Sequence, residues 1–193
     1  MRQTGFTHES TSLAVPIEWY TPPRIFEALN IAFDMDVASP GREFVPWIPA
    51  RIHLTVKENG LITPWRGSVW CNPPYGARTP AWVQKFCEHR NGILLVFSRT
   101  DTAWFHTLTK AEPTLLFVKG RIAFVKGGGP VRETMGAACG SMLAAFGEPC
   151  RQALFGSRLG PVFERASESR RQAGRVFGGH RICACTRRTS SVE

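Results

Sequence analysis

A continuous apolar run from Ile93 to Phe97 is the feature that most restricts the fold of this chain. A strand with one face in water alternates apolar and polar residues, whereas an unbroken run is typical of a parallel strand covered on both faces. Segments 68–71 and 114–118 also have the composition of short strands, and helical spacings lie between them. Strands that alternate with helices predict an α/β fold: a mostly parallel sheet with helices on both faces.

Signals of helix starts lie between these strands. Thr21 followed by two prolines is typical of a hydroxyl N-cap with prolines in the first turn. A second helix is expected from Thr79 and a third from Thr100 or Asp101, each with apolar residues at helical spacing. The small apolar residues of segment 137–146 are expected to form the last strand.

A chain of 193 residues is long enough for one such domain and too short for two ordinary ones. Residues 1–16 are polar and unpatterned, so we expect a flexible N-terminus ahead of a domain that spans residues 17–163. Residues 164–193 are rich in Arg, Ser and Gly, with few large apolar side chains. Because such a segment buries too little surface to offset its ordering entropy, we expect a basic, disordered tail.

Charge and composition limit the classes of binding partner that the chain is expected to have. A net charge of +9 favours a polyanion such as nucleic acid. No run approaches the roughly 20 apolar residues of a membrane span, and the start of the chain lacks a signal-peptide core. We therefore expect a cytoplasmic protein without a membrane partner. The six cysteines are expected to be reduced, the five histidines to lie at the surface without metal-ligand spacing, and no metal to be bound.

Asn72-Pro73-Pro74-Tyr75, directly after the strand expected at 68–71, is the strongest candidate for chemistry. An amino group on an aromatic base is a poor nucleophile, because its lone pair is delocalised into the ring. Two acceptors on its two N–H bonds favour a tetrahedral nitrogen and free that lone pair. The Asn72 side chain offers one acceptor oxygen, and the backbone carbonyl of Pro73 offers the next.

The other residues of this tetrapeptide support the same chemistry. Pro73 and Pro74 fix φ and remove two N–H donors, which leaves a stiff turn that presents carbonyls. The Tyr75 ring offers a face on which an extruded base can stack. Extrusion is required for duplex DNA, because the amino group otherwise lies inside the stack. The sequence therefore predicts a catalytic corner in which Tyr75 also binds nucleic acid.

Further polar residues are expected on the same rim, because open α/β sheets bind ligands at the carboxyl ends of their strands. Asp36 ends a short expected strand and either contacts a ligand or caps a helix. Arg99 follows the run 93–97 and is a candidate for binding phosphate, while Asp101 suits a helix N-terminus. Arg121 is a second candidate for phosphate.

The sequence also resembles the small phage and prophage DNA N6-adenine methyltransferases, from about Glu18 to Phe146. The shared landmarks, in order, are Glu18-Trp19-Tyr20-Thr21-Pro22, Phe33-Asp34-Met35-Asp36-Val37-Ala38, Trp65, Trp70-Cys71-Asn72-Pro73-Pro74-Tyr75-Gly76, Arg99-Thr100-Asp101-Thr102 with Trp104, and Gly120-Arg121-Ile122. The resemblance implies a Rossmann-like methyltransferase fold, S-adenosylmethionine (SAM) as methyl donor, and double-stranded DNA as substrate.

The resemblance also implies which residues meet the cofactor. The Thr21-Pro22 segment would lie at the cofactor pocket, with Thr21 either as a contact or only as an N-cap. Asp36 would anchor the cofactor, and Asn72 would contact it beside the base. The chain has no Gly-x-Gly-x-x-Gly turn. Where the family tends to have an acidic residue before Gly-Leu, this chain has Glu58-Asn59, and either residue is a candidate to replace that contact.

These observations predict a SAM-dependent DNA adenine N6-methyltransferase that transfers the methyl group directly to a flipped base. Two alternatives remain open. The same tetrapeptide also suits a methyltransferase that acts on RNA or on a protein glutamine. A chain that kept the fold and lost the chemistry would be a DNA-binding protein. The sequence predicts no oligomeric state.

Overall fold

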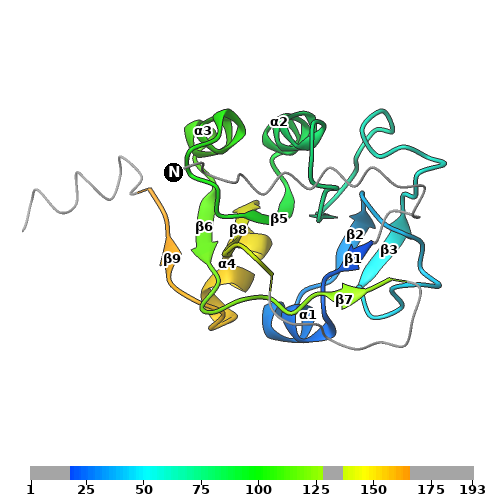
Figure 1. The fold of residues 1–193 in the computed structure, drawn as a ribbon, viewed down its shortest axis with the longest axis horizontal. Helices are drawn as coiled ribbons and strands as arrows, with labels where there is room; N and C mark the ends of the chain where they lie inside the picture. The colour runs from blue at the N-terminus through cyan, green and yellow to red at the C-terminus, as the bar shows by residue number, and fades with distance from the viewer. Residues whose placement is uncertain (1–17, 128–136, 166–193) are drawn as a thin grey trace, which may run out of the picture.

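The computed structural model describes residues 18–127 and 137–165 (Figure 1). The helices in these residues are α1 (Pro23–Leu29), α2 (Thr79–His89), α3 (Ala103–Lys110) and α4 (Glu148–Gly156). The strands are β1 (Trp19–Tyr20), β2 (Phe33–Asp36), β3 (Ala50–His53), β4 (Val69–Cys71), β5 (Gly92–Phe97), β6 (Thr114–Phe117), β7 (Val125–Lys126), β8 (Ser141–Phe146) and β9 (Val162–Phe163). The predicted flexible N-terminus and nearly all of the predicted tail lie outside the described residues.

The main sheet has seven strands in the order β3-β2-β4-β5-β8-β6-β9. Strand β2 is parallel to β3 and to β4, and β4 is parallel to β5. Strand β8 is antiparallel to both of its neighbours, β5 and β6, and β9 is antiparallel to β6. Five strands therefore run in one direction, and β8 and β9 run in the other. The predicted α/β class with a mostly parallel sheet is confirmed.

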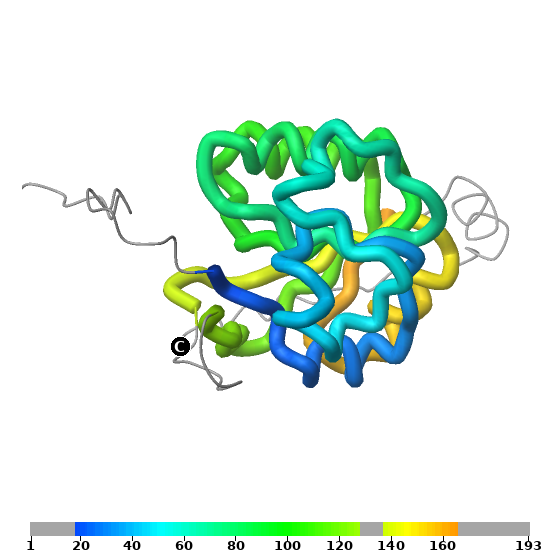
Figure 2. Tube along the Cα trace, turned by 90° about the vertical axis from the view of Figure 1, so that its right-hand side faces the viewer, coloured from blue at the N-terminus to red at the C-terminus, as the bar shows by residue number. Residues whose placement is uncertain are grey.

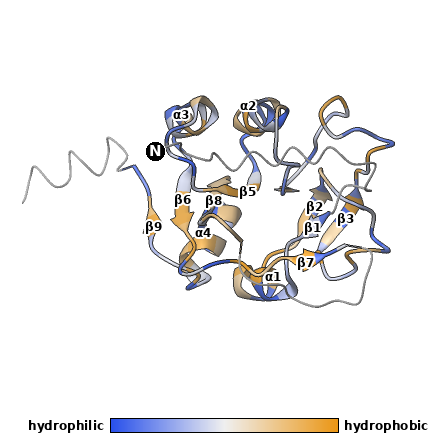
Figure 3. Cartoon of the chain, in the orientation of Figure 1, coloured by the Kyte–Doolittle hydropathy of each residue, from blue (hydrophilic) through white to orange (hydrophobic). Residues whose placement is uncertain are grey.

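Helices cover both faces of this sheet, as predicted. Figure 1 shows α2 and α3 on one side and α1 and α4 on the other, and Figure 2 shows the same separation after a quarter turn. Each helix pair closes its own hydrophobic cluster, one with Phe26 and Leu154, the other with Phe86 and Leu108. The hydrophobic colouring follows the strands, most clearly β6 (Figure 3). No helix among the described residues is both long and apolar enough to cross a membrane.

Strand β5 explains why the apolar run 93–97 has no polar alternation. Ile93 and Leu95 pack in the cluster under α1 and α4, while Leu94 and Val96 pack in the cluster under α2 and α3. Because both faces are covered, every one of these side chains is buried.

Two helices begin later than the sequence predicts. The N-cap of α1 is Pro22, and Thr21 makes no capping hydrogen bond, so the N-cap role expected of Thr21 is wrong. Helix α3 begins at Ala103, because the Thr102 hydroxyl donates to the carbonyl of Arg99 (2.8 Å) and closes a turn before the helix.

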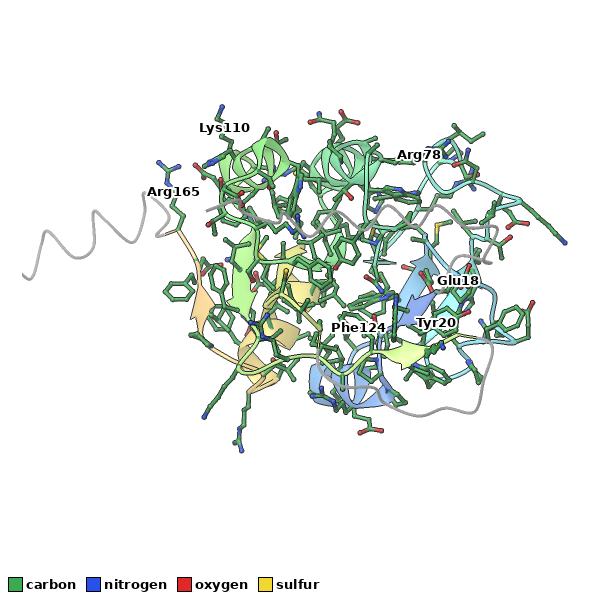
Figure 4. The ribbon with its side chains drawn as sticks, viewed as in Figure 1. Glu18, Tyr20, Arg78, Lys110, Phe124 and Arg165 are labelled. Carbon is green, nitrogen blue, oxygen red and sulfur yellow. The ribbon has the colours of Figure 1, made fainter. Side chains whose placement is uncertain are left out.

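A second, two-stranded ribbon brings the start of the described chain to the sheet. Strands β1 and β7 are antiparallel, with Tyr20 opposite Val125. The Gly127 amide donates to the carbonyl of Glu18 (2.8 Å), and the Tyr20 hydroxyl donates to the Glu18 carboxylate (2.7 Å). Glu18 and Tyr20 lie next to β7 in Figure 4. This ribbon fixes the position of the Thr21-Pro22 segment that follows.

The loop after β3 is clamped to α2 by a lysine. The Lys85 ammonium donates to the carbonyls of Gly60 (2.9 Å), Leu61 (2.8 Å) and Thr63 (2.7 Å). It also lies 5.0 Å from the centre of the Trp65 ring, whose Nε1 donates to the Gly60 carbonyl (2.7 Å). The clamp holds the loop against the end of β2, where the candidate site begins.

Candidate active site

The candidate site lies at the topological switch point of the sheet, between the neighbouring strands β2 and β4. From β2 the chain passes to β3 on one side, and then to β4 on the other side of β2. In open α/β sheets, ligands bind at the carboxyl ends of the strands beside such a switch point. Asp36 ends β2 and Asn72 follows β4, so these two predicted residues flank it.

Asn72 begins the loop that joins β4 to α2. Its Oδ1 is buried and has no hydrogen-bond partner among the described residues. The loop folds back onto α2, because the Thr79 hydroxyl donates to the carbonyl of Pro74 (3.3 Å) and accepts from the Gly76 amide (3.1 Å). Pro73 between them is buried. A stiff turn therefore holds the Asn72 side chain with its acceptor oxygen unused.

Tyr75 lies in the same loop with its ring stacked on that of Phe97. The ring centroids are 4.0 Å apart and the planes differ by 10°. The side chain is 41% exposed, yet burial raises the pKa of the Tyr75 hydroxyl and the nearby charge of Arg99 lowers it. Tyr75 is therefore partly exposed while its ring stacks on that of Phe97.

A buried polar cluster adjoins Asp36 at the ends of β2 and β3. Asp36 Oδ1 accepts from the Ala38 amide (3.3 Å), and its Oδ2 lies 3.6 Å from Nδ1 of His53, its register partner. Ser39 Oγ lies 2.9 Å from the same Nδ1 and accepts from the Gly41 amide (3.1 Å). The His53 side chain is only 5% exposed. The expectation that every histidine lies at the surface is therefore wrong.

The cluster has the composition of a hydrolytic triad but not its geometry. In a triad, the serine and the carboxylate hydrogen-bond to opposite nitrogens of the imidazole. Here Ser39 and Asp36 both approach Nδ1, so no proton path runs from Ser39 through the ring to Asp36. The cluster holds the imidazole in place, and its Nε2 has no partner in the part of the chain that the structure describes.

Several buried side-chain polar atoms have no hydrogen-bond partner within the described residues, and three of them belong to residues at or next to the switch point. Most buried side-chain polar atoms in proteins are hydrogen-bonded, so each exception needs a reason. Trp70 and His53 are both register partners of Asp36, and Asn72 comes two residues after Trp70. The unpartnered buried atoms within the described residues are Thr21 Oγ1, His53 Nε2, Trp70 Nε1, Asn72 Oδ1, Trp82 Nε1 and Ser141 Oγ. Unused donors and acceptors beside Asp36 fit a polar ligand.

Comparison with known families decides what kind of chain this is. Residues 9–158 match the model of the family described as DNA N-6-adenine-methyltransferase (Dam), over most of the chain's length. The chain belongs to the Dam family. The resemblance stated from the sequence landmarks is thereby confirmed. No curated protein and no solved structure gives a significant match to the chain.

In this Dam-family chain, the Thr21-Pro22 segment lies between β1 and α1. Both residues are buried, and the carbonyl of Thr21 accepts from Nε1 of Trp47 (2.9 Å). Thr21 Oγ1 has no hydrogen-bond partner within residues 18–127 and 137–165. With its capping role excluded, its hydroxyl is free for the other role that the sequence predicts, contact with a ligand.

The two arginines expected to bind phosphate are both exposed. Arg99 follows β5 and lies close enough to Tyr75 for its charge to lower the pKa of that hydroxyl. Arg121 precedes β7, and one of its guanidinium nitrogens donates to the carbonyl of Ala138 (2.9 Å). Phosphate binding by either arginine stays a prediction.

Glu58 and Asn59 are engaged in their own turn. The Glu58 carboxylate accepts from the Thr55 amide (2.8 Å) and hydroxyl (2.6 Å), which lowers the pKa of Glu58. Asn59 has a φ of 51°, a conformation that Asn tolerates better than most residues, and its Oδ1 accepts from the Leu61 amide (3.2 Å). The positive φ and this hydrogen bond explain structurally why Asn stands at position 59. A cofactor contact by Glu58 or by Asn59 stays a prediction.

The described cysteines of the Dam-family chain form no disulfide with one another. Cys71, Cys87, Cys139 and Cys150 are free thiols. Burial raises the pKa of Cys87 and that of Cys150 to about 11, which keeps both protonated at neutral pH. Within residues 18–127 and 137–165, no group of three His, Cys, Asp or Glu side chains could hold a metal ion.

Proposed function

We propose that this chain transfers the methyl group of SAM to N6 of an adenine that has been turned out of duplex DNA. At the level of the family, the Dam match indicates DNA adenine N6-methylation. The observation that carries the finer proposal is the buried, unpartnered Oδ1 of Asn72, held by a stiff turn at the switch point of the sheet. An acceptor in that state suits the amine-activating role that the chemistry requires.

The residues around the switch point fit SAM. The ligand carries hydroxyl, ammonium and carboxylate groups, and Asp36, His53 and Thr21 offer an acceptor carboxylate and two unpartnered polar atoms for them. When bound, SAM supplies an electrophilic methyl carbon, and its sulfur keeps the electron pair of the broken bond. The chain supplies the binding groups and the geometry at the amine.

At the amine, Asn72 Oδ1 and the carbonyl of Pro73 would accept hydrogen bonds from the two N–H groups of adenine N6. These bonds localise the nitrogen lone pair, which forms the new bond to carbon. The methylated nitrogen, which then carries a positive charge, would release one of its protons to water. Because Pro73 is buried and the loop is fixed by Thr79, the acceptors need little reorganisation, which is what makes electrostatic stabilisation effective.

On the DNA side, the Tyr75 ring would stack on the extruded base, a contact worth roughly 1–3 kcal/mol per base. Arg99 and Arg121 would neutralise phosphates beside it, in keeping with the net charge of +9. The fold supports a Rossmann-like assignment, because a switch point between the neighbouring strands β2 and β4 and helices on both faces are typical of doubly wound sheets. The central antiparallel β8 is the difference from an all-parallel sheet.

Replacing His53 with Asn is expected to weaken SAM binding about tenfold, the usual effect of one lost hydrogen bond. Asn retains a polar group close to the position of Nδ1, which faces Ser39, and lacks Nε2. His53→Gln, which extends a polar group towards the Nε2 position, is expected to bind SAM more tightly than His53→Asn. Isothermal titration calorimetry measures all three proteins. Equal affinities would remove His53 from the cofactor site.

Calorimetry and labelling together test the proposed function. The wild-type chain is incubated with methyl-labelled SAM and, separately, with duplex DNA, RNA and a glutamine-containing protein extract. Label in duplex DNA alone supports the proposal. Label in RNA or protein would show that the chain methylates a different substrate by the same chemistry. If the chain does not bind SAM, the alternative of a non-catalytic DNA-binding protein is favoured.

A further inference from the structure

Tyr75 contacts a second aromatic side chain, Phe97, at the carboxyl ends of the strands. Cys71 on β4 is the register partner of Leu94 on β5, so the residues that follow both strands reach the same level of the rim. Phe97, three residues beyond Leu94, meets the ring of Tyr75 face to face at 4.0 Å with an angle of 10°. One face of the Tyr75 ring is therefore covered by Phe97.

Phe97 is itself fixed by the fold. It is the last residue of β5 and is paired with Ser141 on β8. Its ring also meets the ring of Phe124 edge to face, with centroids 6.5 Å apart and an angle of 89°. Phe124 is 6% exposed and belongs to the cluster under α1 and α4, at the position labelled in Figure 4. The stack thus runs from the hydrophobic core out to Tyr75.

The residues on both sides of Tyr75 in the chain are exposed. Gly76, the next residue, has a φ of +134°, and a Cβ added there would have no neighbour within 4 Å. Pro74, the preceding residue, is exposed. Without the contact with Phe97, a tyrosine in such surroundings would lose rotamer freedom when a base stacks on it, and this entropy loss would weaken binding.

The distance between the two rings also decides which face is available. Two parallel rings at 4.0 Å are in van der Waals contact, so a base has no room between them. Since 41% of Tyr75 is exposed, its outer face is the one that remains. The outer face of Tyr75 is therefore the face that points away from Phe97.

We infer that Phe97 is a positioning residue for the target base: it holds the Tyr75 ring in place, so that an extruded base stacks on the outer face of a preformed two-ring layer. The inference rests on the proposed function and adds a residue that does not touch the base. Its effect must therefore pass through Tyr75.

A double-mutant cycle between Phe97 and Tyr75 tests this. The probe is a single-stranded oligonucleotide with one 2-aminopurine flanked by abasic sites, which fluoresces strongly until it stacks on an aromatic ring. We expect Phe97→Leu to weaken binding, read from quenching, about fivefold, in line with the loss of one aromatic pair. In Tyr75→Ala protein, Phe97→Leu should change the affinity less than twofold. Phe97→Tyr, which keeps the ring, should restore wild-type quenching.

Phe163→Leu serves as the matched control, because Phe163 also packs on an aromatic ring, that of Phe117, on edge strand β9. It should leave quenching unchanged. The inference is overturned if Phe97→Leu binds like wild type, if its effect is equally large in Tyr75→Ala protein, or if the wild-type chain does not quench the probe. Transfer of label from SAM to adenine by the wild-type chain is measured separately, so loss of the proposed function is distinguished from failure of this inference.

Discussion

Replacing Asn72 with Ala is expected to reduce methyl transfer to DNA at least about 100-fold, the usual effect of removing one preorganised polar group from an active site. The reason is that Oδ1 of Asn72 is buried, unpartnered and fixed by the turn that Thr79 closes, so no other side chain of the loop can replace it. SAM affinity should change only a few-fold, because Asp36 and His53 lie on the other side of the switch point. Single-turnover rates and calorimetry measure the two quantities separately.

Asn72→Asp is the matched variant. It keeps an acceptor oxygen at nearly the same place and adds a negative charge. If the oxygen is what activates the amine, Asn72→Asp should retain at least about ten times the activity of Asn72→Ala. Equal loss in both variants would mean that the amide nitrogen, or the shape of the side chain, carries the effect.

Replacing Gly60 with Ala is expected to destabilise the fold by about 3 kcal/mol, the upper end of the usual cost of overpacking. A Cβ at Gly60 would lie 1.9 Å from the carbonyl oxygen of Val37 and 2.8 Å from the Trp82 ring. The backbone must shift to accept it, and Lys85 holds that backbone by its carbonyls. For a domain of this size, the loss corresponds to a melting temperature about 6–12 °C lower.

Gly156→Ala is the control for this variant. Gly156 ends α4, and a Cβ there would have no neighbour within 4 Å. Ala at this position should be neutral or stabilise by up to about 1 kcal/mol, because it restricts the unfolded chain. Urea denaturation of both variants measures the difference. A Gly60→Ala protein as stable as wild type would show that the loop is not packed against the end of β2.

The sequence predicted those parts of the fold that follow from local pattern. The apolar run 93–97 indicated a doubly covered strand, and the position of Asn72 after an apolar strand indicated a residue on the rim. Both signals depend only on neighbours in the chain. Strand β8 was expected from its small apolar residues, but its antiparallel direction depends on which strands it joins, which no local pattern records.

The residues that sequence reasoning missed are those defined by contacts across the sheet. His53 lies on edge strand β3 after a proline-rich loop, and only its register with Asp36 makes it part of the site. Phe97 appeared as the last residue of an apolar run, and its contact with Tyr75 follows from the pairing of β4 with β5. Helix α4 could have been found, because Pro149 suits a first turn and Cys150 and Leu154 are spaced as one buried face.

The most direct test of the central claim is the identity of the labelled nucleoside. The purified chain is incubated with methyl-labelled SAM and unmethylated duplex DNA, and the DNA is digested and separated by liquid chromatography. We predict label in N6-methyl-2′-deoxyadenosine, at a rate at least about 100-fold lower when Asn72→Ala replaces the wild-type chain. Label in another nucleoside, or a wild-type chain that binds SAM and leaves the DNA unlabelled, would contradict the assignment of Asn72 to Tyr75 as an adenine-methylating site.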